Sequence, residues 1–167
     1  MLDHALPPAL VDAARKVLDA NRALGRTIAV AESCTGGLVS AALTAIPGSS
    51  DVFEVGFITY SNSAKLSVLR VDSNILETFG AVSSATAWAM ARGALERSSA
   101  DIAVAITGVA GPDGGTDKKP VGMVVFARAL RASDADDVLA DTKLFGDLGR
   151  TEIRVQAALA ALELLLP

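Results

Sequence analysis

The chain has 167 residues with a formal net charge of −4, and 51% of its residues are hydrophobic. This length fits one domain with one core, and the apolar share is high enough to favour a folded chain. The negative charge leaves no basic surface for nucleic acid, and no run approaches the roughly 20 apolar residues that span a bilayer, so we expect neither as a partner.

Histidine and cysteine are scarce, which limits the chemistry. His4 and Cys34 are the only ones, so an intrachain disulfide and a zinc site of these residue types are excluded. No secretory leader is recognisable, and we expect a cytoplasmic protein. Because His4 lies in an N-terminal stretch expected to be loose, a Ser-His-Asp triad is not expected, and an activated serine needs another base.

The first predicted element is a helix that begins after Pro7 and Pro8 and ends before Gly25, with apolar residues at helical spacing between them. Residues 27–31 (TIAVA) form an unbroken β-favouring run, typical of a strand covered on both faces. A short helix over residues 38–43 follows. Ser33 therefore lies on a strand-to-helix turn.

The middle of the chain continues the alternation. Residues 53–60 (FEVGFITY) predict a second strand, and Asn62 is expected to cap a helix that carries Lys65 in its first turns. An alanine-rich helix over residues 84–97 precedes a buried strand over residues 101–107.

The last third predicts two strands, a connection and a helix. Residues 121–130 and 138–145 are joined by the polar segment 131–137, which is short enough for an antiparallel hairpin, and residues 151–166 are amphipathic. The whole order predicts an α/β fold, a layered domain with a mixed, mainly parallel sheet flanked by helices and a C-terminal antiparallel hairpin plus helix. We expect a single domain over residues 1–167.

Three loops follow predicted strands, at residues 32–37, 59–65 and 107–120, where open α/β sheets gather their ligands. In the first, two glycines let backbone N–H groups approach an oxyanion or phosphate at a helix N-terminus. The alternative is that Ser33 or Thr35 only caps the helix. The sequence leaves these two interpretations open.

The other two loops are equally ambiguous. Lys65 is either a base toward serine, with a lowered pKa, or an ordinary solvated cation, and Tyr60 either joins it or leaves its hydroxyl in water. The third loop is too rich in glycine for a core segment, and loops of this length are usually functional or disordered. It lacks the spacing of a phosphate-binding P-loop.

Several other side chains are candidates for a catalytic or binding role. Cys34 is a competing nucleophile, but without a histidine to hold a thiolate it is better explained as a small buried side chain. Arg150 and Arg154 open the last helix, either as a solvated face or as partners of a phosphate. A magnesium-dependent phosphohydrolase built on three carboxylates, those of Glu32, Asp113 and Asp117, is a further alternative.

Several motifs occur together in one order, namely AESCTGG, ITYSNSAK, GAVS, ITGVAGPDGGTDKKPVG and a closing F-x-x-x-x-R-x-x-I-R. In this combination the chain resembles the CinA C-terminal domain family from about Leu10 to its end. The resemblance implies a nicotinamide-nucleotide amidase of pyridine nucleotide metabolism, a hydrolase that releases ammonia from nicotinamide mononucleotide and uses no cofactor or metal. The chain looks like the single-domain form.

The resemblance also implies roles for individual residues. Ser33 would be the nucleophile, Lys65 its base, and Tyr60 a member of the same cluster. The implied substrate-binding residues lie in three groups: Thr35, Gly36 and Gly37; Thr107, Gly108, Gly111, Gly114 and Gly115; and Arg150 and Arg154.

Two departures from the family pattern matter. Arg70-Val71 stands where Gly-Val is usual, and the turn before Arg150 is longer than usual, so Arg150 and Arg154 remain alternatives for the phosphate. A catalytically silent nucleotide-binding module that serves a partner protein is the second hypothesis. We also expect a homodimer, because the helices over residues 84–97 and 151–166 offer more apolar face than one small sheet needs.

Overall fold

The computed structural model describes residues 5–134 and 137–167. The strands of these residues form one sheet in the order β2-β1-β3-β4-β5. Strand β1 pairs in parallel with β2 and β3, whereas β4 pairs antiparallel with β3 and β5. The strands are β1 (Ile28–Glu32), β2 (Phe53–Ile58), β3 (Ile102–Gly108), β4 (Met123–Leu130) and β5 (Val138–Leu144).

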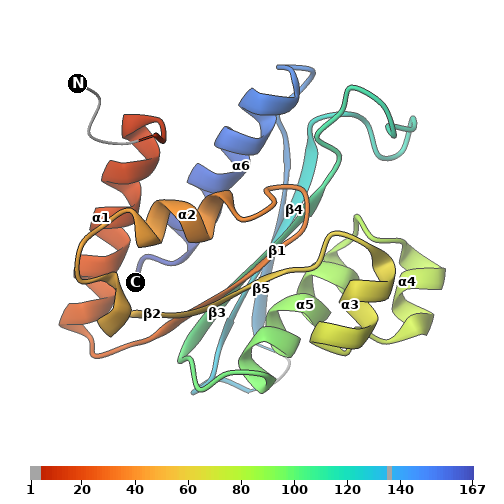
Figure 1. Ribbon diagram of the computed structural model, residues 1–167. Helices are drawn as coiled ribbons and strands as arrows, with labels where there is room; N and C mark the ends of the chain where they lie inside the picture. Colours follow the sequence, from red (N-terminus) through yellow and green to blue (C-terminus); the bar gives the residue numbers. More distant parts are fainter. Residues whose placement is uncertain (1–4, 135–136) are drawn as a thin grey trace.

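Helices cover both faces of the sheet. One face carries α1, α2 and α6, and the other carries α3, α4 and α5, so the sheet is the middle of three layers (Figure 1). This arrangement confirms the predicted mixed α/β fold, including the C-terminal hairpin and helix. The helices are α1 (Pro8–Ala23), α2 (Leu38–Thr44), α3 (Asn62–Leu69), α4 (Ser73–Phe79), α5 (Ser84–Glu96) and α6 (Arg150–Leu164), with a 3-10 turn at Ser49–Asp51.

The two faces of the central strands differ in side-chain size. Within β3, Ile102, Val104 and Ile106 pack in the core under α1, α2 and α6. The alternate residues Ala103 and Ala105 pack in the core under α5. Successive side chains of a strand point to opposite faces, so this alternation lets the alanine-rich α5 lie close to the sheet.

Three sequence predictions about local structure were wrong. Helix α4 was not predicted, because its seven residues are too few to show a helical period. Its N-cap is Asp72, whose carboxylate accepts from the Asn74 N–H at 2.8 Å. The cap of α3 is Ser61 rather than Asn62. Strand β2 ends at Ile58, two residues earlier than predicted, so Thr59 and Tyr60 belong to the loop.

The apolar faces of α5 and α6 are largely used within the chain. Their buried residues pack against the sheet and, for α6, against α1 and α2. The surplus apolar face behind the expected dimer is therefore not seen in the part of the chain that the structure describes, and the dimer stays a prediction. His4 and part of the 131–137 connection lie outside the described residues. None of the described helices is long and apolar enough to cross a membrane.

Candidate active site

The carboxyl ends of the parallel strands β1, β2 and β3 meet at one edge of the sheet, as their pairing requires. The loops that follow these strands surround a pocket of about 200 Å³. A larger hollow of about 360 Å³ between α1 and α6 contains none of the predicted site residues. The smaller pocket is lined by Ser33, Cys34, Tyr60, Lys65, Ala81, Val82, Thr107, Gly108, Ala110 and Arg150.

At the bottom of this pocket, Lys65 and Ser33 form a buried pair. The Lys65 side chain is 1% exposed, and its Nζ lies 3.0 Å from Ser33 Oγ. The same Nζ donates to the carbonyl oxygens of Thr59, at 2.9 Å, and of Tyr60, at 3.3 Å. The interpretation of Lys65 as a solvated cation is therefore wrong.

Burial also changes the protonation of Lys65. Loss of solvent lowers the pKa of its amine from the ordinary value, and only the Cys34 thiol opposes this shift. Within the described residues, no carboxylate forms an ion pair with Lys65. A neutral amine that donates to the two carbonyl oxygens has its lone pair available to accept the proton of Ser33. This geometry suits acceptance of the serine proton.

The turn that carries Ser33 is held by Glu32, which is fully buried. Its Oε2 accepts from the N–H groups of Gly37 and Val39, both at 3.1 Å, and its Oε1 accepts from the Ser40 N–H at 2.9 Å and hydroxyl at 2.7 Å. The interpretation of Ser33 or Thr35 as the helix cap is therefore wrong, because the Glu32 carboxylate performs that function.

All backbone N–H groups from Gly36 to Ala41 are occupied, three by Glu32 and three by the carbonyl oxygens of Ser33, Thr35 and Gly37. The N-terminus of α2 has no donor left for a substrate oxyanion or phosphate. The N–H groups of Cys34 and Thr35 have no acceptor among the described residues. The Cys34 N–H directly follows Ser33, the position from which serine hydrolases commonly stabilise an oxyanion.

Cys34 itself is poorly suited to attack. Its side chain is 5% exposed, and burial raises the pKa of its thiol to about 11. At neutral pH the thiol stays protonated, and only the thiolate is strongly nucleophilic. The description of Cys34 as a small buried side chain fits the structure.

The two arginines of α6 occupy different places. Arg150 lines the pocket, where its guanidinium donates to the Tyr60 hydroxyl at 2.8 Å and to the Gly111 carbonyl at 2.7 Å. Arg154 lies behind the nucleophile turn and donates to the carbonyl oxygens of Cys34, at 3.2 Å, and Thr35, at 2.8 Å. Of these two arginines, Arg150 lines the pocket and Arg154 does not.

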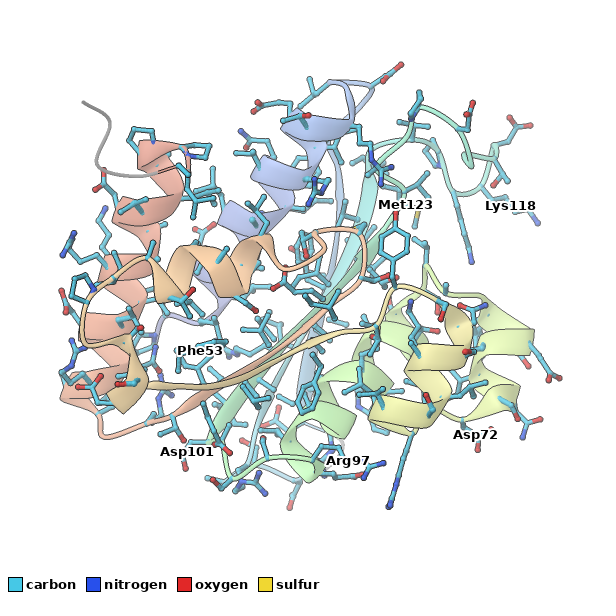
Figure 2. All side chains as sticks on the ribbon, in the orientation of Figure 1. Phe53, Asp72, Arg97, Asp101, Lys118 and Met123 are labelled. Carbon is cyan, nitrogen blue, oxygen red and sulfur yellow. The ribbon has the colours of Figure 1, made fainter. Side chains whose placement is uncertain are left out.

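The glycine-rich loop after β3 contributes unequally to the site. Thr107 donates to the Ala81 carbonyl at 2.8 Å and thereby ties the loop before α5 to the pocket wall. Gly114 and Gly115 do not line the pocket, and neither do Gly111, Thr35, Gly36 and Gly37. Figure 2 shows Lys118 at the outer end of the loop and Met123 where β4 begins.

The carboxylates named for a magnesium site do not converge. Asp113 and Asp117 are exposed in the glycine-rich loop, whereas Glu32 is buried beneath α2. In residues 5–134 and 137–167, no three His, Cys, Asp or Glu side chains come together as metal ligands. The carboxylate of Glu32 is already committed to four hydrogen bonds.

Sequence reasoning missed two features of the pocket. Ala81 and Val82 line it, although small apolar residues carry no chemical signal by themselves. They belong to the GAVS motif that contributed to the family resemblance, which was the available clue. The helix-holding role of Glu32 was also missed, because its partners are backbone groups.

With the geometry established, comparison with known proteins identifies the family. The model of the CinA C-terminal domain matches residues 11–167. The chain belongs to this family. Among solved structures, competence/damage inducible protein CihA from Agrobacterium tumefaciens superposes with a TM-score of 0.92 at 48% identity, over 97% of this chain and 96% of that one. A CinA superfamily protein from Klebsiella pneumoniae gives 0.87 at 35% identity, over 93% and 94% of the two chains.

Curated relatives agree with this assignment. A putative competence-damage inducible protein from Symbiobacterium thermophilum is 52% identical over 83% of this chain. A CinA-like protein from Mycobacterium avium is 50% identical over 84% of it. These matches cover 33% and 32% of the relatives' own lengths, so the chain spans about a third of the curated relatives that it matches.

Proposed function

We propose that this CinA-family chain hydrolyses the carboxamide of nicotinamide mononucleotide, with Ser33 as nucleophile and Lys65 as base, and releases nicotinate mononucleotide and ammonia. The observation that carries the proposal is the 3.0 Å contact between Ser33 Oγ and a buried lysine amine that forms no ion pair within the described residues. A silent binding module has no need to desolvate a lysine beside a serine, because that burial costs stability. The pair therefore favours an enzyme.

The acylation half of the reaction follows from the pair. Neutral Lys65 accepts the Ser33 proton as Oγ attacks the carboxamide carbon, and the carbonyl oxygen becomes an oxyanion near the Cys34 N–H. The resulting ammonium then gives its proton to the amide nitrogen, the C–N bond breaks, and ammonia leaves. The product of this half is an ester between Ser33 and the nicotinoyl group.

Deacylation reverses the proton transfers. A water molecule enters where ammonia left, and Lys65 accepts its proton as the water oxygen attacks the ester carbon. The same amine returns that proton to Ser33 Oγ as the ester bond breaks. The carboxylic acid product leaves and gives its proton to solvent, which makes it the carboxylate, and both side chains regain their starting protonation. No step requires a metal ion or a cofactor.

Arg150 provides the positive charge that binds the phosphate of the substrate. Its guanidinium is exposed at the pocket, where a phosphate would find a cation that binds with two parallel donors. Arg154 does not line the pocket, and its guanidinium donates to the carbonyl oxygens of Cys34 and Thr35 behind the nucleophile turn. We therefore assign the phosphate contact to Arg150.

An ammonia-release assay over nicotinamide mononucleotide, nicotinamide riboside and free nicotinamide tests the proposal. We expect turnover of the mononucleotide to exceed that of the riboside, because only the mononucleotide carries the phosphate. EDTA should leave the rate unchanged, and Ser33→Ala should abolish it while Ser67→Ala, on the exposed side of α3, should not. Loss of activity with EDTA and recovery with magnesium would instead favour the phosphohydrolase.

A further inference from the structure

We infer that Glu32 is a positioning residue, whose buried carboxylate holds the Ser33 turn in the geometry that attack requires. The inference rests on the proposed function in taking Ser33 as the nucleophile, but it does not depend on which amide is hydrolysed. Glu32 is the last residue of β1, directly precedes Ser33 and is 0% exposed. It does not line the pocket, so it acts on the reaction through Ser33.

The side chain of Glu32 connects strand β1 to the first turn of α2. Each of its two oxygens accepts two hydrogen bonds. Three of these four bonds come from backbone N–H groups and one comes from the Ser40 hydroxyl. Hydrogen bonds to a charged acceptor are stronger than those between neutral groups. No basic side chain pairs with Glu32 in the described residues, so the donors around α2 are what balance its charge.

The turn needs such an anchor because of its own sequence. Gly36 and Gly37 adopt φ values of 58° and 96°. Glycine adopts this left-handed region without strain, but it adopts other conformations as easily. These two glycines separate Ser33 from the regular part of α2. With the carboxylate in place, the N–H of Gly37 is fixed relative to β1, and the segment from Ser33 to Gly37 closes on a defined path.

The backbone of Glu32 also reaches the base. Its carbonyl oxygen accepts from the Thr59 N–H at 2.9 Å, and the Thr59 carbonyl accepts from Lys65 Nζ at 2.9 Å. Glu32 is therefore bonded to two segments of the site. Its side chain holds α2, which follows the nucleophile, and its carbonyl oxygen binds the loop that orients the Lys65 amine. A displacement of the Glu32 side chain changes the position of the Ser33 turn relative to Lys65, whereas Arg150, the proposed phosphate contact, is bonded to other groups.

The test compares Glu32→Gln with the wild-type chain. Glutamine has the same shape, but its NH₂ group replaces one carboxylate oxygen. This group cannot accept the hydrogen bonds that the backbone N–H groups donate to that oxygen. The direct readout is labelling of Ser33 by a fluorophosphonate: the Oγ–P bond forms, the P–F bond breaks, fluoride leaves, and the serine proton passes to Lys65. We expect the maximal labelling rate and kcat for nicotinamide mononucleotide to fall by about 100-fold, with KM changed less than about 3-fold, since small misplacements of a reacting group cost this much.

Glu54→Gln is the matched control. Glu54 lies on the neighbouring strand β2 and likewise accepts from one backbone N–H and one hydroxyl, those of Ser99, at 2.9 and 3.0 Å. It is exposed and is not part of the pocket, so its replacement should leave the labelling rate unchanged. All rates are measured far below the unfolding temperature, with circular dichroism verifying that each variant is folded.

If Glu32→Gln does not fold, Ser40→Ala decides, because it removes only the 2.7 Å hydroxyl bond to Oε1. We expect a labelling rate about 3- to 10-fold below wild type, the loss of one charge-assisted hydrogen bond. Wild-type labelling in a folded Glu32→Gln, or in Ser40→Ala when it is the deciding variant, overturns the inference. A wild-type chain that labels but releases no ammonia refutes the amidase alone, whereas one that does neither refutes both proposals.

Discussion

The bottom of the pocket and its rim are built in different ways. At the bottom, the Ser33 turn has its N–H groups from Gly36 to Ala41 occupied, and Arg154 binds two of its carbonyl oxygens. At the rim, Tyr60 is 60% exposed and Arg150 is exposed as well, and each contacts the other across the opening. The bottom is fixed before substrate arrives, whereas the rim has room to adjust.

This difference separates two tasks. Attack on an amide requires a nucleophile and base whose relative position does not vary, and buried hydrogen bonds provide that constancy. Recognition of a phosphate requires an accessible cation, which burial would remove. We therefore expect changes of Ser33, Lys65 and Arg154 at the bottom to lower kcat, and a change of Arg150 at the rim to raise KM.

The largest effect is expected for Ser33→Ala. Without the hydroxyl no ester intermediate forms, and kcat should fall by about 10⁴-fold or more, as for other serine nucleophiles. Cys34→Ala is the matched control because it removes the neighbouring buried group, whose raised thiol pKa of about 11 keeps it protonated. Ammonia release should stay within about 3-fold of wild type in that variant. The reverse order of activities would make Cys34 the nucleophile.

Lys65→Arg should be nearly as inactive as Lys65→Ala, with kcat lowered by about 10²- to 10⁴-fold in both. The guanidinium preserves the positive charge but cannot accept a proton in the accessible pH range. Restored activity in the arginine variant would show that Lys65 acts through its charge alone.

The pH dependence of kcat/KM also tests the assignment of Lys65 as the base. The active form of Lys65 is the neutral amine, so kcat/KM should rise with pH and level off above the pKa of this amine. Because burial lowers this pKa, the plateau should begin at a lower pH than an exposed lysine would give. A profile that falls with rising pH over this range would contradict the assignment.

Arg150→Ala should change binding more than chemistry. Loss of a charged hydrogen bond to phosphate corresponds to about 1.5–3 kcal/mol, or roughly a 10- to 100-fold higher KM, with kcat nearly unchanged. Arg154→Ala is the comparison, because that side chain contacts the nucleophile turn instead and should lower kcat at similar KM. Identical kinetic patterns in the two variants would remove the distinction between bottom and rim.

How far the sequence predicts this site depends on the kind of partner each residue has. Ser33, Tyr60 and Lys65 lie at or after the ends of predicted strands, but their residue types alone left a catalytic role open, and the family resemblance implied their roles; the pocket brings these three residues together. Strand and helix types followed from periodicity, whereas α4 was too short to show one. Glu32 was named only in the alternative of a metal-dependent phosphohydrolase, since an acidic residue beside a serine does not reveal that its partners are N–H groups farther along the chain.

The smallest effect concerns stability beneath the fixed bottom of the pocket. Arg70 ends α3, the helix that carries Lys65, with φ at 55°, and it is the only residue other than glycine with a positive φ in the described chain. A residue with a Cβ in this conformation lowers the free energy of unfolding by roughly 1–2 kcal/mol. Glycine removes this strain but loses more conformational entropy on folding, so only part of that free energy is regained. Arg70→Gly should therefore stabilise the fold by about 0.5–1 kcal/mol, or raise Tm by about 1–4 °C.

Arg70→Ala is the control, because it removes the same guanidinium but keeps the Cβ that makes the conformation costly. Denaturant unfolding should show a gain for the glycine variant only, with kcat and KM unchanged in both, since Arg70 is exposed and lies outside the pocket. An equal gain in both variants would assign the cost to the arginine side chain rather than to its backbone. A change of kcat in the glycine variant would show instead that the end of α3 sets the position of the Lys65 amine, so that the fixed region extends from the Ser33 turn to Arg70.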